Sequence, residues 1–138
     1  MTKLKQIVVF ILLKENKLLV EKRSHGGVWE GQFLFPGGAV EHHEEGNLEL
    51  ALKREAKEEL GIEVLAYEKV HSRKPIFGWN KVLVNIFLIK DYIGNLPQIV
   101  LDRGDPLIWV DLQIMINSPI RPVSEIAQAI QIQFIANK

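Results

Sequence analysis

Two long apolar runs dominate the hydrophobic pattern of this chain, and each predicts a buried strand. The first, Ile7 to Leu13, is continuous and rich in β-branched residues, so both faces of the strand would be covered. The second, Lys81 to Lys90, has the same character between its two lysines. A polar turn over Lys14 to Lys17 separates the first run from Leu18 to Arg23, which predicts a second strand that pairs back on the first.

Helical patterns occur in the middle and at the end of the chain. Leu48 to Leu60 contains neither Gly nor Pro, which predicts a helix with Asn47 as N-cap and Gly61 just past its end. A second helix is predicted from Ser124, as its cap, to about Asn137, because apolar residues recur there on one side.

The segment between the second predicted strand and the first helix differs from the rest of the chain. Residues 24–46 contain paired glycines, a proline and a run of polar side chains, which predicts a long irregular stretch. Ile62 to Val70 and Leu107 to Val110 are predicted to be extended. With no internal repeat and no linker, the pattern predicts a single α/β domain over residues 1–138.

Composition and charge narrow the classes of function. The 138 residues are 47% hydrophobic and 25% charged, which excludes a disordered or low-complexity chain. Lys+Arg and Asp+Glu are both 17, so no basic excess favours nucleic-acid binding. Cysteine is absent, which excludes disulfides and thiolate chemistry. No apolar run approaches the roughly 18 residues of a membrane span, so we expect a soluble, cytoplasmic protein without membrane or nucleic-acid partners.

Three glutamates fall on one side of the first predicted helix. At about 100° per residue, Glu58 lies about 60° to one side of Glu55, and Glu59 lies about 40° to the other side. The apolar positions occupy the adjacent arc, so the acidic edge borders the buried face; they are Leu48, Leu52, Ala56 and Leu60. Crowded carboxylates repel unless a hard divalent cation such as Mg²⁺ binds them. Because Mg²⁺ also binds phosphate oxygens, the pattern favours a pyrophosphate site.

Simpler interpretations compete with this one. The helix could be a solvated face with salt bridges such as Arg54–Glu58, and Phe35 to Gly38 could be only a tight turn. Neither interpretation explains why a glycine pair precedes acids that border an apolar edge. Gly37 and Gly38 would let the backbone approach an ion, with a carbonyl as an additional ligand.

The segment from Gly38 to Ile62 resembles the signature of the Nudix (MutT-like) hydrolase family. That signature has Gly, five residues, Glu, seven residues, and then Arg-Glu-apolar-x-Glu-Glu-x-Gly-apolar. Its second half matches at every position, which are Arg54, Glu55, Ala56, Glu58, Glu59, Gly61 and Ile62. The lead-in Phe35 to Gly38 also matches. The resemblance implies the Nudix fold, a mixed β-sheet sandwiched between α-helices.

The first half of the signature departs from the family pattern. Fifteen residues separate Gly38 from Arg54, where the family has thirteen. An insertion of two residues in the loop reconciles the counts and leaves Glu44 or Glu45 as the first signature glutamate, whose role in the family is mainly structural. Counting forward from Gly38 selects Glu44, so the signature residues are Gly38, Glu44, Arg54, Glu55, Glu58, Glu59 and Gly61.

The resemblance implies a role for each matching residue. Glu58 and Glu59 would bind Mg²⁺, or Mn²⁺ in its place, with help from the Gly37 carbonyl. Glu55 would be a metal ligand or the base that takes a proton from the attacking water, and Arg54 would orient these acids. Many family members add an acid from a distant loop, for which Asp102 and Asp105 are the candidates here.

Other side chains leave two interpretations open. Arg23, Arg73 and Lys74 would meet substrate phosphates or be merely solvated, and we place Arg23 and Gly38 in the substrate site. Loop aromatics would stack on a base or join the core; they are Trp29, Phe33, Phe77 and Trp79. His42 and His43 suit a solvated polar loop better than a transition-metal site, because no third ligand has the right spacing.

The resemblance therefore implies a metal-dependent hydrolase that cleaves the pyrophosphate linkage of a nucleoside diphosphate joined to another moiety. The substrate would be a nucleoside triphosphate, including an oxidised one, or ADP-ribose or a nucleotide sugar. The alternative is a non-catalytic Nudix-fold module that binds a nucleotide or regulates a partner. A homodimer is compatible with either function.

Overall fold

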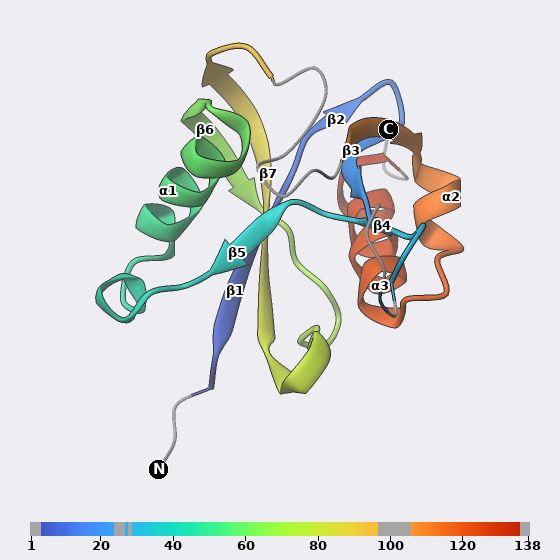
Figure 1. The fold of residues 1–138 in the computed structure, drawn as a ribbon, viewed down its shortest axis with the longest axis horizontal. Coiled ribbons are helices and arrows are strands. Elements are labelled where there is room, and N and C mark those ends of the chain that lie inside the picture. Colours follow the sequence, from blue (N-terminus) through green and yellow to red (C-terminus); the bar gives the residue numbers. More distant parts are fainter. Residues whose placement is uncertain (1–3, 24–26, 28, 97–105, 136–138) are drawn as a thin grey trace.

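The computed structural model of the chain describes residues 4–23, 27, 29–96 and 106–135, and its first sheet holds both long apolar runs. In this sheet the strand order is β5 (Gly37–Ala39), β1 (Gln6–Ile11), β7 (Leu83–Ile93) and β6 (Glu63–Lys69). β1 runs parallel to β7 and antiparallel to β5, so the sheet is mixed (Figure 1). The two predicted central strands are therefore direct neighbours.

A second sheet forms around β3 (Lys17–Lys22), which pairs antiparallel with three short strands. They are β2 (Leu13–Lys14), β4 (Phe33–Leu34) and β8 (Leu107–Asp111). The first apolar run was predicted to be one strand to Leu13, and this was wrong. β1 ends at Ile11, and the chain then enters the second sheet, because Leu13 pairs with Leu18 of β3.

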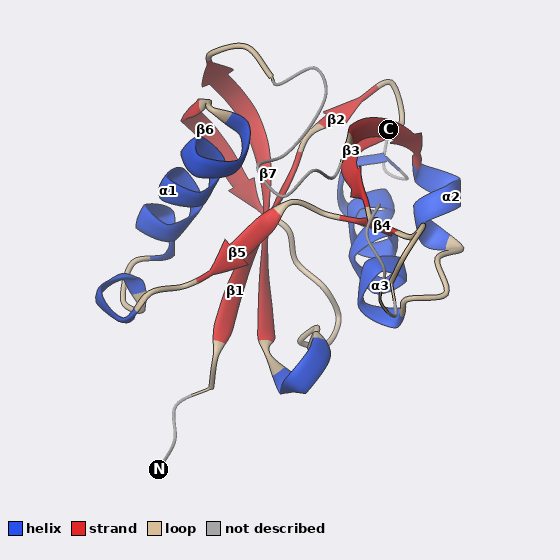
Figure 2. Cartoon of the chain, in the orientation of Figure 1, coloured by secondary structure: helices blue, strands red, loops and turns tan. Residues whose placement is uncertain are grey.

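Helices cover both faces of the first sheet, which confirms the predicted sandwich. Val8 and Phe10 of β1 pack in one apolar cluster with α1 (Leu48–Leu60). Val9 and Ile11, which point to the opposite face, pack in a second cluster with α3 (Arg121–Ile130). Figure 2 shows α1 and α3 on opposite sides of β1 and β7.

The helix α1 has the predicted bounds. Gly61 follows it with φ of 68°, a left-handed conformation that favours glycine, and donates its N–H to the Lys57 carbonyl at 2.9 Å. Asn47 occupies the N-cap position, but its side chain makes no capping hydrogen bond. None of the helices within the described residues is long and apolar enough to cross a bilayer.

The prediction that Ser124 caps the last helix was wrong. α3 begins at Arg121, and Ser124 lies inside it, where its hydroxyl donates to the Ile116 carbonyl. A short helix that was not predicted, α2 (Leu112–Ile116), precedes it, and a π-helical turn, η3 (Gln131–Ile135), follows it. The sequence does contain a signal for the start of α3 at Arg121. Pro122 occupies the first turn of the helix, where proline is well tolerated.

The stretch predicted to be irregular, residues 24–46, contains three short elements. They are β4, β5 and a 3₁₀ helix, η1 (His42–Glu44). Strands of two or three residues carry no periodic pattern, and these two form because the longer strands β1 and β3 offer them free edges.

Candidate active site

The glycine pair is part of β5, where it lies between β1 and α1. Gly37 pairs with Val9, and Gly38 pairs with Val8. A Cβ atom on Gly37 would lie 2.1 Å from the Val8 carbonyl oxygen, and one on Gly38 would lie 2.2 Å from Cδ of Glu55. Gly37 is therefore required by the neighbouring backbone, whereas Gly38 makes room for the carboxylate of Glu55.

The carbonyl of Gly37 faces away from β1. The Phe10 N–H donates to the Pro36 carbonyl at 3.1 Å, so the alternating ladder directs the carbonyls of residues 36 and 38 toward β1. The carbonyls of residues 37 and 39 then lie on the outer edge. The Ala39 carbonyl accepts a hydrogen bond there from Arg54 Nη2 at 2.9 Å. This placement is compatible with Gly37 as a metal ligand.

Arg54 connects this edge to the helix and the preceding loop. Its Nε and Nη2 donate to the two oxygens of Glu44, each at 2.8 Å, which forms a bidentate pair. Its Nη1 donates to Glu55 Oε1 at 2.9 Å and to Glu58 Oε2 at 3.1 Å. One guanidinium thus holds three carboxylates and the carbonyl of β5.

Glu44, rather than Glu45, is the glutamate of the inserted loop that meets Arg54. Glu44 is 1% exposed and also accepts the Glu41 N–H at 2.9 Å. The hydrogen bonds from Arg54 outweigh the opposing effect of burial and lower the pKa of Glu44 to about 2. The same pairing raises the pKa of Arg54, which keeps the guanidinium charged. Glu45 instead lies 3.5 Å from His42 Nδ1.

The three signature acids of α1 differ in exposure. The Glu55 side chain is 12% exposed and the Glu58 side chain 59%, and Glu59 has intermediate exposure. Within the described ranges, no three His, Cys, Asp or Glu side chains form a group that could hold a metal ion. The donors nevertheless fit Mg²⁺ chemically, because carboxylate and carbonyl oxygens line this edge and Gly38 leaves the space occupied by the Glu55 carboxylate.

The remaining residues that were predicted to belong to the site lie outside the Arg54 network. His42 and His43 are exposed beside Glu45 and Glu41, as a solvated loop requires. Arg73 and Lys74 line a pocket against α3 rather than the acidic edge. The candidate acids Asp102 and Asp105 lie outside the described residues. Phe33 packs beside the second core cluster, whereas Phe77 is exposed.

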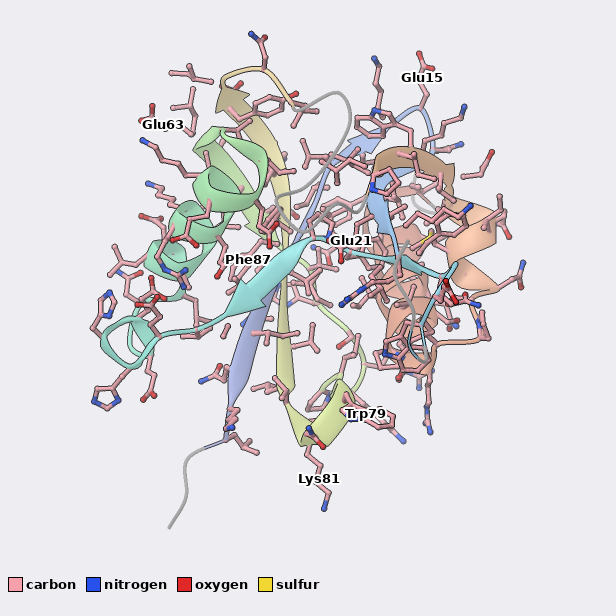
Figure 3. The ribbon with its side chains drawn as sticks, viewed as in Figure 1. Glu15, Glu21, Glu63, Trp79, Lys81 and Phe87 are labelled. Atoms are coloured by element: carbon pink, nitrogen blue, oxygen red, sulfur yellow. The ribbon has the colours of Figure 1, made fainter. Side chains whose placement is uncertain are left out.

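Two of the loop aromatics, which are far apart in the sequence, contact each other. Trp29 and Trp79 make an edge-to-face contact with ring centroids 6.0 Å apart and an interplanar angle of 87°. Figure 3 shows Trp79 with Lys81 at the bottom of the view, at the turn η2 (Trp79–Lys81) that precedes β7.

Two features of the structure were not predicted from the sequence. The Ala39 carbonyl joins the Arg54 network through its backbone, which leaves no signal in residue type. Glu21 is a buried carboxylate beside Arg23, with Oε1 3.7 Å from Arg23 Nε. A charged residue at the end of the apolar run Leu18 to Val20 was the signal that could have identified it.

A family model described as the NUDIX domain matches residues 3–124. The match covers most of the chain, and the chain therefore belongs to the NUDIX family, which confirms the predicted family and fold. The prediction of an enzyme is confirmed at the same level, because the curated relatives are nucleotide pyrophosphohydrolases.

Individual relatives agree with this assignment. The chain is 33% identical over 90 residues to an 8-oxo-dGTP diphosphatase of Buchnera aphidicola subsp. Schizaphis graminum, a match that covers 65% of this chain and 66% of that protein. It is 28% identical over 124 residues to the CTP pyrophosphohydrolase of Escherichia coli K12, covering 87% of this chain and 85% of that protein. A MutT structure described for Aliivibrio salmonicida and Vibrio cholerae has a TM-score of 0.68 and 25% identity, and covers 99% of this chain and 100% of that chain.

The glycine pair provides the first test of this site. Because a side chain can rotate away and a backbone carbonyl in a sheet cannot, Gly38→Ala should cost only about 1–3 kcal/mol of stability, whereas Gly37→Ala should cost more. Gly38→Ala should also lower kcat more than tenfold, since it displaces Glu55. Thermal unfolding and turnover of both variants measure this. A Gly38→Ala protein that loses stability but keeps its activity would assign Gly38 a purely structural role.

The Glu44–Arg54 pair predicts a dependence of stability on pH. The pKa of Glu44 falls from 4.5 to about 2 on folding, which corresponds to about 3 kcal/mol of stability. Because the folded pKa is the lower one, this contribution is complete above about pH 4.5 and is lost as the pH falls toward 2. Denaturant unfolding of Glu44→Gln should therefore show a loss at pH 7 that shrinks in acid. Glu45→Gln is the matched control and should change stability little at either pH.

Proposed function

We propose that this protein is a divalent-metal-dependent hydrolase that cleaves the pyrophosphate linkage of a nucleoside triphosphate. The observation that carries the proposal is the packing of the Glu55 carboxylate against Gly38, where Arg54 holds it in place. Carboxylates and a backbone carbonyl lie at one edge, and oxygen ligands of this kind are those that Mg²⁺ takes beside substrate phosphates.

The residues of this edge would have separate roles in binding the ion and in accepting a proton. Glu58, Glu59 and the Gly37 carbonyl would hold the ion, which when bound neutralises phosphate charge and makes water a better nucleophile. Arg54 donates hydrogen bonds to Oε1 of Glu55 and to Oε2 of Glu58. The other oxygen of each carboxylate is therefore the one that would bind the ion or accept a proton. Oε2 of Glu55 is the atom that would accept the proton of the attacking water in the base role.

The choice of a nucleoside triphosphate over ADP-ribose or a nucleotide sugar is supported by the relatives. Two of these relatives are named as an 8-oxo-dGTP diphosphatase and a CTP pyrophosphohydrolase, and both names describe enzymes that act on nucleoside triphosphates. The contact between Trp29 and Trp79 offers aromatic surface for stacking on a base, which all of these candidate substrates carry. The cytoplasmic location and a homodimer stay predictions.

The alternative, a nucleotide-binding module without activity, is less well supported. A module that only binds has no need for three acids and an arginine bonded to two of them at the helix edge. Turnover of a panel of compounds with and without Mg²⁺ separates the two functions. The panel holds the common and oxidised nucleoside triphosphates, ADP-ribose and a nucleotide sugar. We expect Mg²⁺-dependent release of a nucleoside monophosphate and pyrophosphate, while binding without product would favour the module.

The proposed ligands can be tested by substitution. Glu58→Gln and Glu59→Gln should each lower kcat by at least about a hundredfold and raise the Mg²⁺ concentration needed for half-maximal rate. Folding should survive, because Glu58 is exposed and Glu59 has intermediate exposure. Glu63→Gln, an exposed acid of β6, is the control and should behave as the wild type. Wild-type turnover of the Glu58 or Glu59 variant would refute the ligand assignment.

A further inference from the structure

A third buried carboxylate lies outside the Arg54 network, on the second sheet. Among the described residues, the buried charged side chains are Glu21, Glu44 and Glu55. Arg54 bonds Glu44 and Glu55, whereas Glu21, which is 2% exposed, belongs to β3. Burying a carboxylate is unfavourable unless a positive charge or hydrogen bonds compensate it. The buried carboxylate of Glu21 therefore indicates a role beyond packing.

The register of β3 places Glu21 where the two sheets meet near the glycine pair. Alternation puts Glu21 on the same face as Leu19, which packs in the apolar cluster of α1. On the flanking strands, Glu21 pairs with Leu34 and Leu107. From Leu34 the chain leads directly to Gly38, and Figure 3 labels Glu21 at the centre of the view, beside this segment. Glu21 is thus close in the fold to the strand that adjoins Glu55.

Arg23, the residue directly after β3, is a cation beside Glu21. Its Nε lies 3.7 Å from Glu21 Oε1, and this nitrogen is buried although the Arg23 side chain is 39% exposed. The backbone of Arg23 is held as well, because its N–H donates to the Gln32 carbonyl at 3.0 Å and its carbonyl accepts the Gly31 N–H at 2.7 Å. The pair therefore has a buried anionic end and a cationic end that reaches solvent.

We propose that Glu21 is a positioning residue for substrate binding, which holds the Arg23 guanidinium where it meets the phosphate chain of the substrate. This inference rests on the proposed function, which supplies the phosphates. The guanidinium is a planar fork that matches two phosphate oxygens only in a suitable orientation. An arginine that is already oriented loses less conformational freedom on binding, so the buried charge of Glu21 would strengthen phosphate binding without touching the substrate.

A double-mutant cycle tests this role. The proteins are the wild type, Glu21→Gln, Arg23→Gln and the double variant, with Glu68→Gln as a control that removes the charge paired with Lys90 at 3.2 Å on the first sheet. The probe is inorganic pyrophosphate in the presence of Mg²⁺, with its affinity measured by calorimetry. The KM and kcat for a nucleoside triphosphate are measured alongside.

We expect Glu21→Gln to weaken pyrophosphate binding and to raise KM by about tenfold each. In the Arg23→Gln background the same change should have no further effect, because Glu21 acts through Arg23. Glu68→Gln should bind as the wild type does.

Other outcomes overturn the proposal. Equal losses from Glu21→Gln in both backgrounds would show that Glu21 acts independently of Arg23, and unchanged binding would show that it positions nothing. If Glu21→Gln does not fold, Glu21→Asp, which keeps the charge but shortens the side chain, replaces it in the same cycle under the same criteria. If the wild type hydrolyses no nucleotide, the proposed function fails, while the pyrophosphate cycle still decides the role of Glu21.

Discussion

The ion pair between Glu44 and Arg54 is the interaction on which the rest of the site depends. Glu44 is almost completely buried, and its charge is stable there because both oxygens accept hydrogen bonds from the guanidinium. Once anchored in this way, Arg54 has Nη1 directed toward Glu55 and Glu58 and Nη2 within reach of the Ala39 carbonyl. The loop, the helix and the edge strand are therefore joined through one side chain.

This arrangement explains why an acidic helix edge can border a hydrophobic core. Ala51, Leu52 and Ala56 are fully buried against the sheet, and Glu55 lies beside them with little exposure. Without a positive partner, a carboxylate in that position would lose its hydration with no interaction to compensate the loss, and the helix would be destabilised. Arg54 removes that penalty, while the glycine at position 38 leaves the space that the carboxylate needs. Stability and the proposed chemistry thus depend on the same contacts.

The proposed substrate contact involves a residue that follows a strand of the second sheet. α1 supplies the acids that would hold a cation, whereas Arg23, which directly follows β3, is a cation that would meet the anionic substrate. In both places a buried carboxylate lies against a partly exposed arginine: Glu44 against Arg54, and Glu21 beside Arg23. Under the proposed function, each arginine would be oriented before a ligand arrives, which would reduce the conformational cost of binding.

Much of this protein was determined by local sequence. Period and length identified β1, β3, β7 and the bounds of α1, since long runs carry their pattern without help from neighbours. The spacing of Glu55, Glu58 and Glu59 placed them on one helix edge, and the signature around Arg54 identified the family.

Tertiary structure decided the rest. β4 and β5 exist only because longer strands offer them partners, and the choice of Glu44 over Glu45 depends on which carboxylate reaches Arg54 once the loop has folded. The environment of Glu21 was also undetermined by sequence, because a glutamate in a strand can face either water or a sheet junction, and only packing between distant segments selects one.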